Sequence, residues 1–143
     1  MPASLDEIIA ELKDADRQER IDLLIDFAKS LPPLPERLEA HKDASHRVEE
    51  CQSPVYLFIE LDDDGRVRLF ADAPIESPTV RGFVSILVEG LGGSTPEEVA
   101  AVPNDLVEKA GLLEILGMLR IRGLSAMVHR VKKGVAKAVT LRG

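Results

Sequence analysis

The stretch TVRGFVSILVEGLGG, residues 79–93, decides the fold, because its helical pattern is apolar over most of the circumference. The apolar side chains are Val80, Phe83, Val84, Ile86, Leu87, Val88 and Leu91. A helix of this kind must be buried, so the segment is predicted to form the centre of the core. Gly90, Gly92 and Gly93 lack the spacing and the Lys-Ser/Thr pair of a phosphate-binding loop, so they indicate a helix C-terminus.

A β-hairpin is predicted before this helix. Side chains alternate between two faces over Val55–Leu61 and again over Val67–Ala71. The intervening Asp62–Gly65 fits a tight turn, and it lacks the alternating acid spacing of a calcium loop. Residues His46–Val48 are expected to add a short third strand. Because helices and strands occupy separate blocks, the fold class is α+β, a small antiparallel β-sheet packed with several α-helices.

Two amphipathic helices are predicted at the N-terminus, where they form a helical hairpin. Each begins with a capping box, Ser4 with Glu7 and Asp16 with Glu19. The first helix is expected over residues 5–13, and Pro32-Pro33 end the second. A stiff connector follows over residues 31–44, with one helical turn expected around Glu36–His41.

Three further helices are predicted after the central one. Thr95 caps a short helix that runs to about Val102. Asn104 is expected to cap another, over Asp105–Ala110. The last helix carries one apolar seam, made by Ile121, Leu124, Val128, Val131 and Val135, with Met127 and Val139 beside it.

The composition describes one globular domain over residues 1–143. Apolar residues make up 45% and charged residues 30%, and the net charge of −7 argues against general nucleic-acid binding. No apolar run approaches the roughly eighteen residues of a membrane span, and the N-terminus does not resemble a signal peptide. One cysteine and no export signal predict a reducing, cytoplasmic location.

The charge is unevenly distributed along the chain. From residue 115 to the end there is no acidic residue, and the basic residues are Arg120, Arg122, Arg130, Lys132, Lys133, Lys137 and Arg142. The helix dipole accounts for the cations near the C-terminus. Arg120 and Arg122 lie near the predicted helix start, so a thiolate or an acidic partner protein is expected to need them. Nucleic acid is disfavoured by the acidic body and the lack of aromatic stacking residues.

The only cysteine, Cys51, lies in the polar stretch Glu49–Pro54, just before the first predicted strand. A single thiol cannot close an internal disulfide, and it cannot supply the several thiolates of a structural zinc or iron–sulfur site. Free cysteines are often inert core residues, whereas a polar turn favours a functional thiol. The residues alone leave both interpretations open.

An ordered set of motifs resembles the SufE family of sulfur-acceptor proteins. The motifs are Cys51-Gln52-Ser53 before an apolar strand, Thr79-Val80-Arg81-Gly82 at the start of the central helix, and LRIRGLSAM over residues 119–127. Each motif alone is weak, but their order and spacing cover most of the chain and look closest to actinobacterial members. The resemblance implies a fold like that of the IscU scaffold, a small sheet with helices packed on it.

The resemblance also implies a function in sulfur transfer. Members accept persulfide sulfur from a pyridoxal-phosphate cysteine desulfurase of the SufS type, activate that enzyme, and deliver the sulfur to an iron–sulfur assembly scaffold of the SufBCD type. The chain by itself is then expected to turn over no small molecule and to need no cofactor or metal. The identity of the desulfurase and the existence of a homodimer stay open.

Site residues follow from the same resemblance. Cys51 is the expected catalytic thiol, supported by Gln52, Ser53 and Arg120. Adjacent glutamates raise the pKa of a thiol, so Arg120 is expected to be the cation that comes close to it. The expected partner surface comprises Glu50, Asp72, Arg81 and Arg122.

Two other functions are weighed against the relay. A metal-binding scaffold of the IscU type needs more soft ligands than Cys51, and His41, His46 and His129 are scattered along the chain. A stand-alone thiol enzyme needs a Cys–His pair, and the position of no histidine in the sequence indicates such a pair.

Overall fold

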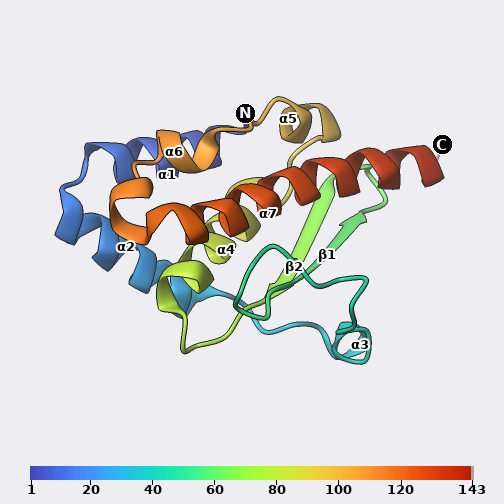
Figure 1. Ribbon diagram of the computed structural model, residues 1–143. Coiled ribbons are helices and arrows are strands. Elements are labelled where there is room, and N and C mark those ends of the chain that lie inside the picture. The colour runs from blue at the N-terminus through green and yellow to red at the C-terminus, as the bar shows by residue number, and fades with distance from the viewer. Residues whose placement is uncertain (143) are drawn as a thin grey trace.

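The computed structural model describes residues 1–142. These residues form a two-stranded antiparallel sheet and seven helices (Figure 1). The helices are α1 (Ala3–Asp14), α2 (Arg17–Ser30), α3 (Glu36–Glu39), α4 (Pro78–Leu91), α5 (Pro96–Ala100), α6 (Leu106–Lys109) and α7 (Leu113–Arg142), and the strands are β1 (Tyr56–Leu61) and β2 (Val67–Asp72). The α+β class and the small antiparallel sheet are confirmed. No helix among the described residues combines the length and the apolar character that a membrane span requires.

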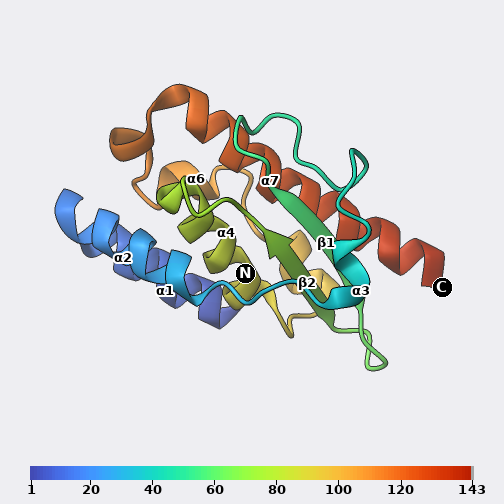
Figure 2. The ribbon, with the colours of Figure 1, turned by 90° about the horizontal axis from the view of Figure 1, so that it is seen from below.

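Helix α4 lies at the centre, as its apolar pattern predicts. Figure 2 shows α1 and α2 along one side of the molecule and α7 along the other, with α4 and the sheet between them. Helices α1 and α2 pack on α4, while β2 packs on its other side. The approach of α2 depends on Gly82, since a Cβ there would lie 2.0 Å from the Leu24 carbonyl oxygen.

The predicted hairpin is present, with Leu61 opposite Val67 and Tyr56 opposite Asp72. One face of the sheet joins the main core. The other face carries Phe58, which is buried with Leu34 and Leu38 of the connector and α3. The expected third strand is reduced to a single bridge between Arg47 and Tyr56.

Two predicted caps are wrong. Ser4 does not cap α1; its hydroxyl donates to the Gly90 carbonyl at 2.9 Å and ties α1 to the end of α4. Asn104 does not cap α6, which begins after Asp105 without a side-chain cap. The capping boxes of α2 and α5 are confirmed.

Helix α7 is interrupted at Gly117, where φ is 76° and ψ is 166°. The backbone there is in a region that glycine adopts readily, and the break separates residues 113–116 from the long helix. The predicted seam is buried, together with Met127, but Val139 is 42% exposed and lies outside the core.

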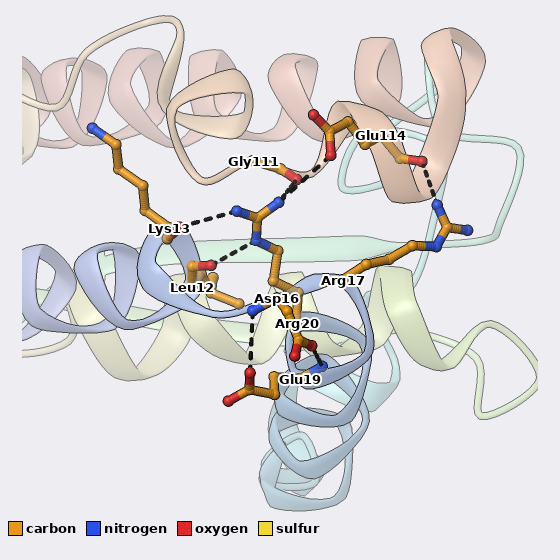
Figure 3. Close-up of polar contacts among 8 residues, drawn as sticks. All are labelled: Leu12, Lys13, Asp16, Arg17, Glu19, Arg20, Gly111 and Glu114. Atoms are coloured by element: carbon orange, nitrogen blue, oxygen red, sulfur yellow. Dashed lines mark hydrogen bonds and ion pairs between the residues drawn. The ribbon is translucent and has the colours of Figure 1, made fainter.

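An arginine anchors the N-terminal hairpin to the segment before this break (Figure 3). The Arg20 guanidinium donates to the carbonyls of Leu12 (2.8 Å), Lys13 (3.0 Å) and Gly111 (3.1 Å). Nearby, Arg17 donates to the Glu114 carbonyl at 3.0 Å. These bonds satisfy carbonyls at the C-terminus of α1 and hold the start of α7 against α2.

Candidate functional site

Cys51 lies in a loop, residues 49–54, that main-chain hydrogen bonds close at its base. The Val48 N–H donates to the Val55 carbonyl at 2.9 Å, and the Cys51 N–H donates to the Val48 carbonyl at 3.1 Å. The bridge between Arg47 and Tyr56 continues this pairing by one step. The loop is therefore an excursion from the edge of the sheet, directly before β1.

Helix α7 and the start of α4 hold the loop from two sides. Gly123 faces Cys51, since a Cβ on Gly123 would lie 3.2 Å from both the sulfur and the Cα of that residue. The Ser53 hydroxyl shares a 2.9 Å hydrogen bond with the hydroxyl of Ser77, the residue that precedes α4. The absence of a side chain on Gly123 is what lets the helix approach the thiol this closely.

The thiol is buried, with 6% of Cys51 exposed, and it belongs to the main core cluster. This differs from the accessible thiol that the polar flanks suggest, because Glu49, Glu50 and Gln52 point outward while Cys51 points inward. A small cavity of about 70 Å³ adjoins the thiol. It is lined by Cys51, Gln52, Ser53, Val80, Leu119, Arg120 and Gly123. The three motifs of the sequence analysis thus meet around this one cavity.

Burial raises the pKa of the Cys51 thiol above its ordinary value. The Ser53 backbone N–H and the positive charge of Arg47 act in the opposite direction, and Glu50 adds a smaller upward effect. The resting thiol is therefore held in its protonated, weakly nucleophilic form. Any change that exposes the thiol to water would favour the thiolate.

Two arginines differ in their relation to the thiol, and the sequence analysis named only one of them, Arg120. Arg120 lines the cavity, as expected, but its side chain is exposed and its charge is not among the causes of the thiol pKa. Arg47, which the sequence analysis missed, is the cation that lowers that pKa. Its position four residues before Cys51 gave no signal, because only the folded loop determines where its guanidinium lies.

Gln52 and Ser53 have different positions at the site. The Ser53 backbone N–H hydrogen-bonds the Cys51 sulfur, while the Ser53 hydroxyl is hydrogen-bonded to the Ser77 hydroxyl. Gln52 lines the cavity with an exposed side chain. Val80, Leu119 and Gly123 complete the cavity and were missed as site residues, although they lie within the quoted motifs.

The expected partner-surface residues differ in their exposure and in the bonds that they already form within the protein. Glu50 and Arg122 are exposed. Asp72 is half-buried and pairs with Lys42 at 2.7 Å. Arg81 donates to the carbonyls of Ala28 (2.9 Å) and Ala73, so its guanidinium is engaged inside the protein.

Next to the cavity, α7 exposes two large apolar side chains beside Arg120. Met118 is 64% exposed and Leu119 is 58% exposed, directly after the break at Gly117. Exposed large apolar side chains beside a functional group favour contact with another protein.

The described residues contain no group of three or more His, Cys, Asp or Glu side chains placed to hold a metal ion. The cavity beside Cys51 is lined by no histidine either. The geometry of residues 1–142 therefore gives no support to a metal scaffold or to a Cys–His enzyme.

Comparison with known proteins agrees with the motifs. Residues 6–135 match the family model described as SufE, Fe-S metabolism associated domain. A SufE-like protein of Mycobacterium tuberculosis is 41% identical over 138 residues, which cover 96% of this chain and 95% of that protein.

More distant relatives extend the similarity. A protein of Plasmodium falciparum named cysteine desulfuration protein SufE is 28% identical over 108 residues, 74% of this chain and 42% of that one. The solution structure of a hypothetical protein from Thermus thermophilus has a TM-score of 0.84 and 35% identity and covers 98% of both chains. The chain belongs to the SufE family.

Proposed function

We propose that Cys51 accepts a sulfur atom from the persulfide of a pyridoxal-phosphate cysteine desulfurase of the SufS type and delivers it for iron–sulfur cluster assembly on a SufBCD-type scaffold. The observation that carries the proposal is the single thiol facing a small cavity that all three family motifs line. Family membership and the name of the Plasmodium relative support the same chemistry. The chain is expected to act in the cytoplasm.

The transfer conserves atoms and electrons. The Cys51 thiolate attacks the outer sulfur of the donor persulfide, so a new S–S bond forms as the donor's S–S bond breaks. The electron pair of the broken bond leaves with the donor cysteine, which becomes a thiolate. Cys51 is left carrying the persulfide, and no external oxidant or reductant is consumed.

The cavity has a role after the transfer. Its volume of about 70 Å³ exceeds the roughly 10–15 Å³ that a single water needs. There is room beside the thiol for one additional sulfur atom, which the surrounding side chains would shield from other thiols. The apolar walls at Val80 and Leu119 suit a soft, weakly hydrated sulfur.

Acceptance requires the thiol to leave this position, because 6% exposure is too little for contact with a second protein. The loop is held by few bonds, chiefly the Val48–Val55 pair at its base and the Ser53–Ser77 hydroxyl contact. Each contributes on the order of 1 kcal/mol, so a docked partner can offset their loss. Arg120, exposed at the cavity, is then available to stabilise the thiolate as it reacts.

The test is to incubate the chain with a purified cysteine desulfurase, pyridoxal phosphate and cysteine. Intact-mass and peptide mass spectrometry should find one added sulfur atom on Cys51, and desulfurase turnover should rise when the chain is added. The Cys51→Ser variant is the control and should show neither effect. A wild-type chain that stays unmodified while turnover is unchanged would sink the proposal.

A further inference from the structure

The outer edge of β2 carries main-chain groups that face away from β1. In an antiparallel ladder each residue points its N–H and C=O to the same side, and neighbouring residues point to opposite sides. The Val67 N–H donates to the Ser94 carbonyl at 2.8 Å, and the Val67 carbonyl accepts from the Gly93 N–H at 2.9 Å. Val67 therefore faces outward. By alternation, Leu69 and Ala71 face outward too.

These two residues have no main-chain partner. Within residues 1–142, no backbone or side-chain group forms a hydrogen bond with the outward N–H or C=O of Leu69 or Ala71. A strand edge in this state is a template for pairing with another extended chain. The protein itself pairs the edge at Val67 and leaves the next two positions unpaired.

A groove of about 440 Å³ runs along this edge. One wall is β2, from Arg68 to Ala71, and another is the connector after α2, which Figure 2 shows passing beside the sheet. The connector residues in the groove include Pro32, Pro33 and Pro35. Because proline has no N–H, this segment is poorly suited to pair with β2 as a strand.

The groove also has a distinct chemistry on each face. Val88 of α4 supplies an apolar surface on the core side. On the outer face, Arg68 is exposed and lies 5.7 Å from the centre of the Phe70 ring. Among residues 1–142 no carboxylate lies within ion-pair distance of Arg68; Glu60, which is opposite Arg68 in the hairpin and feels its charge, is bound by Arg37 at 2.6 Å.

We propose that this edge binds an extended peptide segment of a partner protein, which adds to the sheet as a new outer strand beside β2. The unpaired groups of Leu69 and Ala71 supply main-chain hydrogen bonds, and the two faces of the groove select the side chains. Successive residues of a strand point to opposite faces, so the peptide alternates apolar residues toward Val88 with acidic residues toward Arg68. The proposal is independent of the chemistry of Cys51.

A second copy of the chain does not supply this strand through its own β2. The matching edge of that copy is flanked by the same connector, which blocks an edge-to-edge approach.

Amide hydrogen exchange measured by NMR tests the first step. In the unbound protein the Leu69 and Ala71 amides should exchange much faster than those of Arg68 and Phe70, which face β1. Equal protection of all four amides would mean that the edge is already satisfied, and the proposal would be wrong.

The peptide is then found and tested on the intact protein. Decapeptides selected from a phage-displayed random library should show the alternating apolar and acidic pattern and should protect the Leu69 and Ala71 amides. N-methylation of the alternate peptide residues that face β2 should raise Kd by at least about tenfold, and N-methylation of the others by less than about twofold. A library that yields no binder, or binders that protect other amides, overturns the proposal.

Two variants of the protein test whether the β2 edge and the Arg68 charge bind the peptide. Ala71→Pro removes one outward donor without touching the pairing with β1, and Arg68→Glu reverses the charge on the outer face. Each should weaken the selected peptide by about tenfold or more, a change of ~1.4 kcal/mol. Cys51→Ser is the matched control and should bind the peptide like the wild type. If Ala71→Pro does not fold, the N-methylated peptides decide the question.

Discussion

Burial of the Cys51 side chain raises the pKa of its thiol, so this pKa depends on the groups immediately around the sulfur. The sulfur is enclosed by the cavity wall and supported by the Ser53 N–H and the Arg47 charge. A thiol in this state is expected to be protected from adventitious oxidation and to react faster when the loop rearranges.

The pH dependence of alkylation follows from this burial. Because the folded state disfavours the thiolate, iodoacetamide should modify folded Cys51 more slowly at neutral pH than it modifies the unfolded chain, with a rate that rises through a pKa above that of an ordinary thiol. The neutral thiol stabilises the fold fully at pH values below the pKa that the thiol has in the unfolded chain. This stabilisation is lost as pH rises through the higher pKa of the folded state. Stopped-flow alkylation at a series of pH values measures the pKa of Cys51 in the folded state. A folded-state pKa below the ordinary value would contradict it.

The two arginines should have separable effects. Arg47→Ala should raise the pKa of Cys51 further, because it removes the cation that opposes the burial effect. Arg120→Ala should leave that pKa unchanged and slow sulfur transfer by about tenfold, ~1.4 kcal/mol at the barrier. Alkylation profiles and single-turnover transfer from a desulfurase distinguish them. If Arg120→Ala changes neither quantity, the role assigned to Arg120 is wrong.

At the scale of elements, close approaches of backbone decide how the site is assembled. Helix α7 reaches the thiol loop at Gly123, and α2 reaches α4 at Gly82. These glycines lie inside the family motifs, and the structure gives each a steric reason.

Gly123→Ala should disturb the site more than the fold. The added Cβ would lie 3.2 Å from the Cys51 sulfur and Cα, so the loop must move by a few tenths of an ångström. We expect faster alkylation of Cys51 and a change in the free energy of unfolding within about 1 kcal/mol, since alanine also favours the helix. Gly134→Ala in the same helix is the control, because its Cβ meets the flexible end of Ile59. Equal alkylation rates in both variants would contradict the prediction.

Gly82→Ala should destabilise the whole fold. The Leu24 carbonyl, 2.0 Å from the added Cβ, belongs to the backbone of α2 and cannot rotate away. The free energy of unfolding should fall by about 3 kcal/mol, which lowers Tm by roughly 10 °C. Urea denaturation and calorimetry measure the loss. A variant as stable as wild type would mean that α2 and α4 can separate at little cost.

At the scale of the molecule, one core cluster unites the described chain. It includes residues from α1, such as Leu5, through Leu69 of β2 and Phe83 of α4 to Val135 of α7. The small cluster around Phe58 covers the outer face of the same sheet. Within residues 1–142 both clusters therefore involve the same sheet.

A single cooperative transition is therefore expected for the full chain. Tyr56 is the only tyrosine and the chain has no tryptophan, so tyrosine fluorescence reports the sheet, while far-UV circular dichroism reports the helices. The two signals should give coincident urea transitions. Earlier loss of the tyrosine signal would show that the sheet and its α3 cover unfold separately.

Much of the secondary structure was predictable because its signals are local. The apolar circumference of α4, the alternation around Asp62–Gly65 and the capping box at Asp16 each need only neighbouring residues. The caps predicted at Ser4 and Asn104 failed because tertiary contacts gave those residues other surroundings. For Ser4, the competing partner is the Gly90 carbonyl, 86 positions away in the chain.

The sequence by itself determined the family, the single thiol and the order of helices and strands, since these follow from residue types and their spacing. Only the tertiary structure decided that Cys51 is buried, that the Arg47 charge lowers its pKa, and that the edge of β2 is unpaired at Leu69 and Ala71. The physical reason is that burial, charge and strand pairing depend on distances between segments far apart in the chain. A polar loop shows where a thiol is carried, whereas the packing of α7 against that loop decides whether water can reach it.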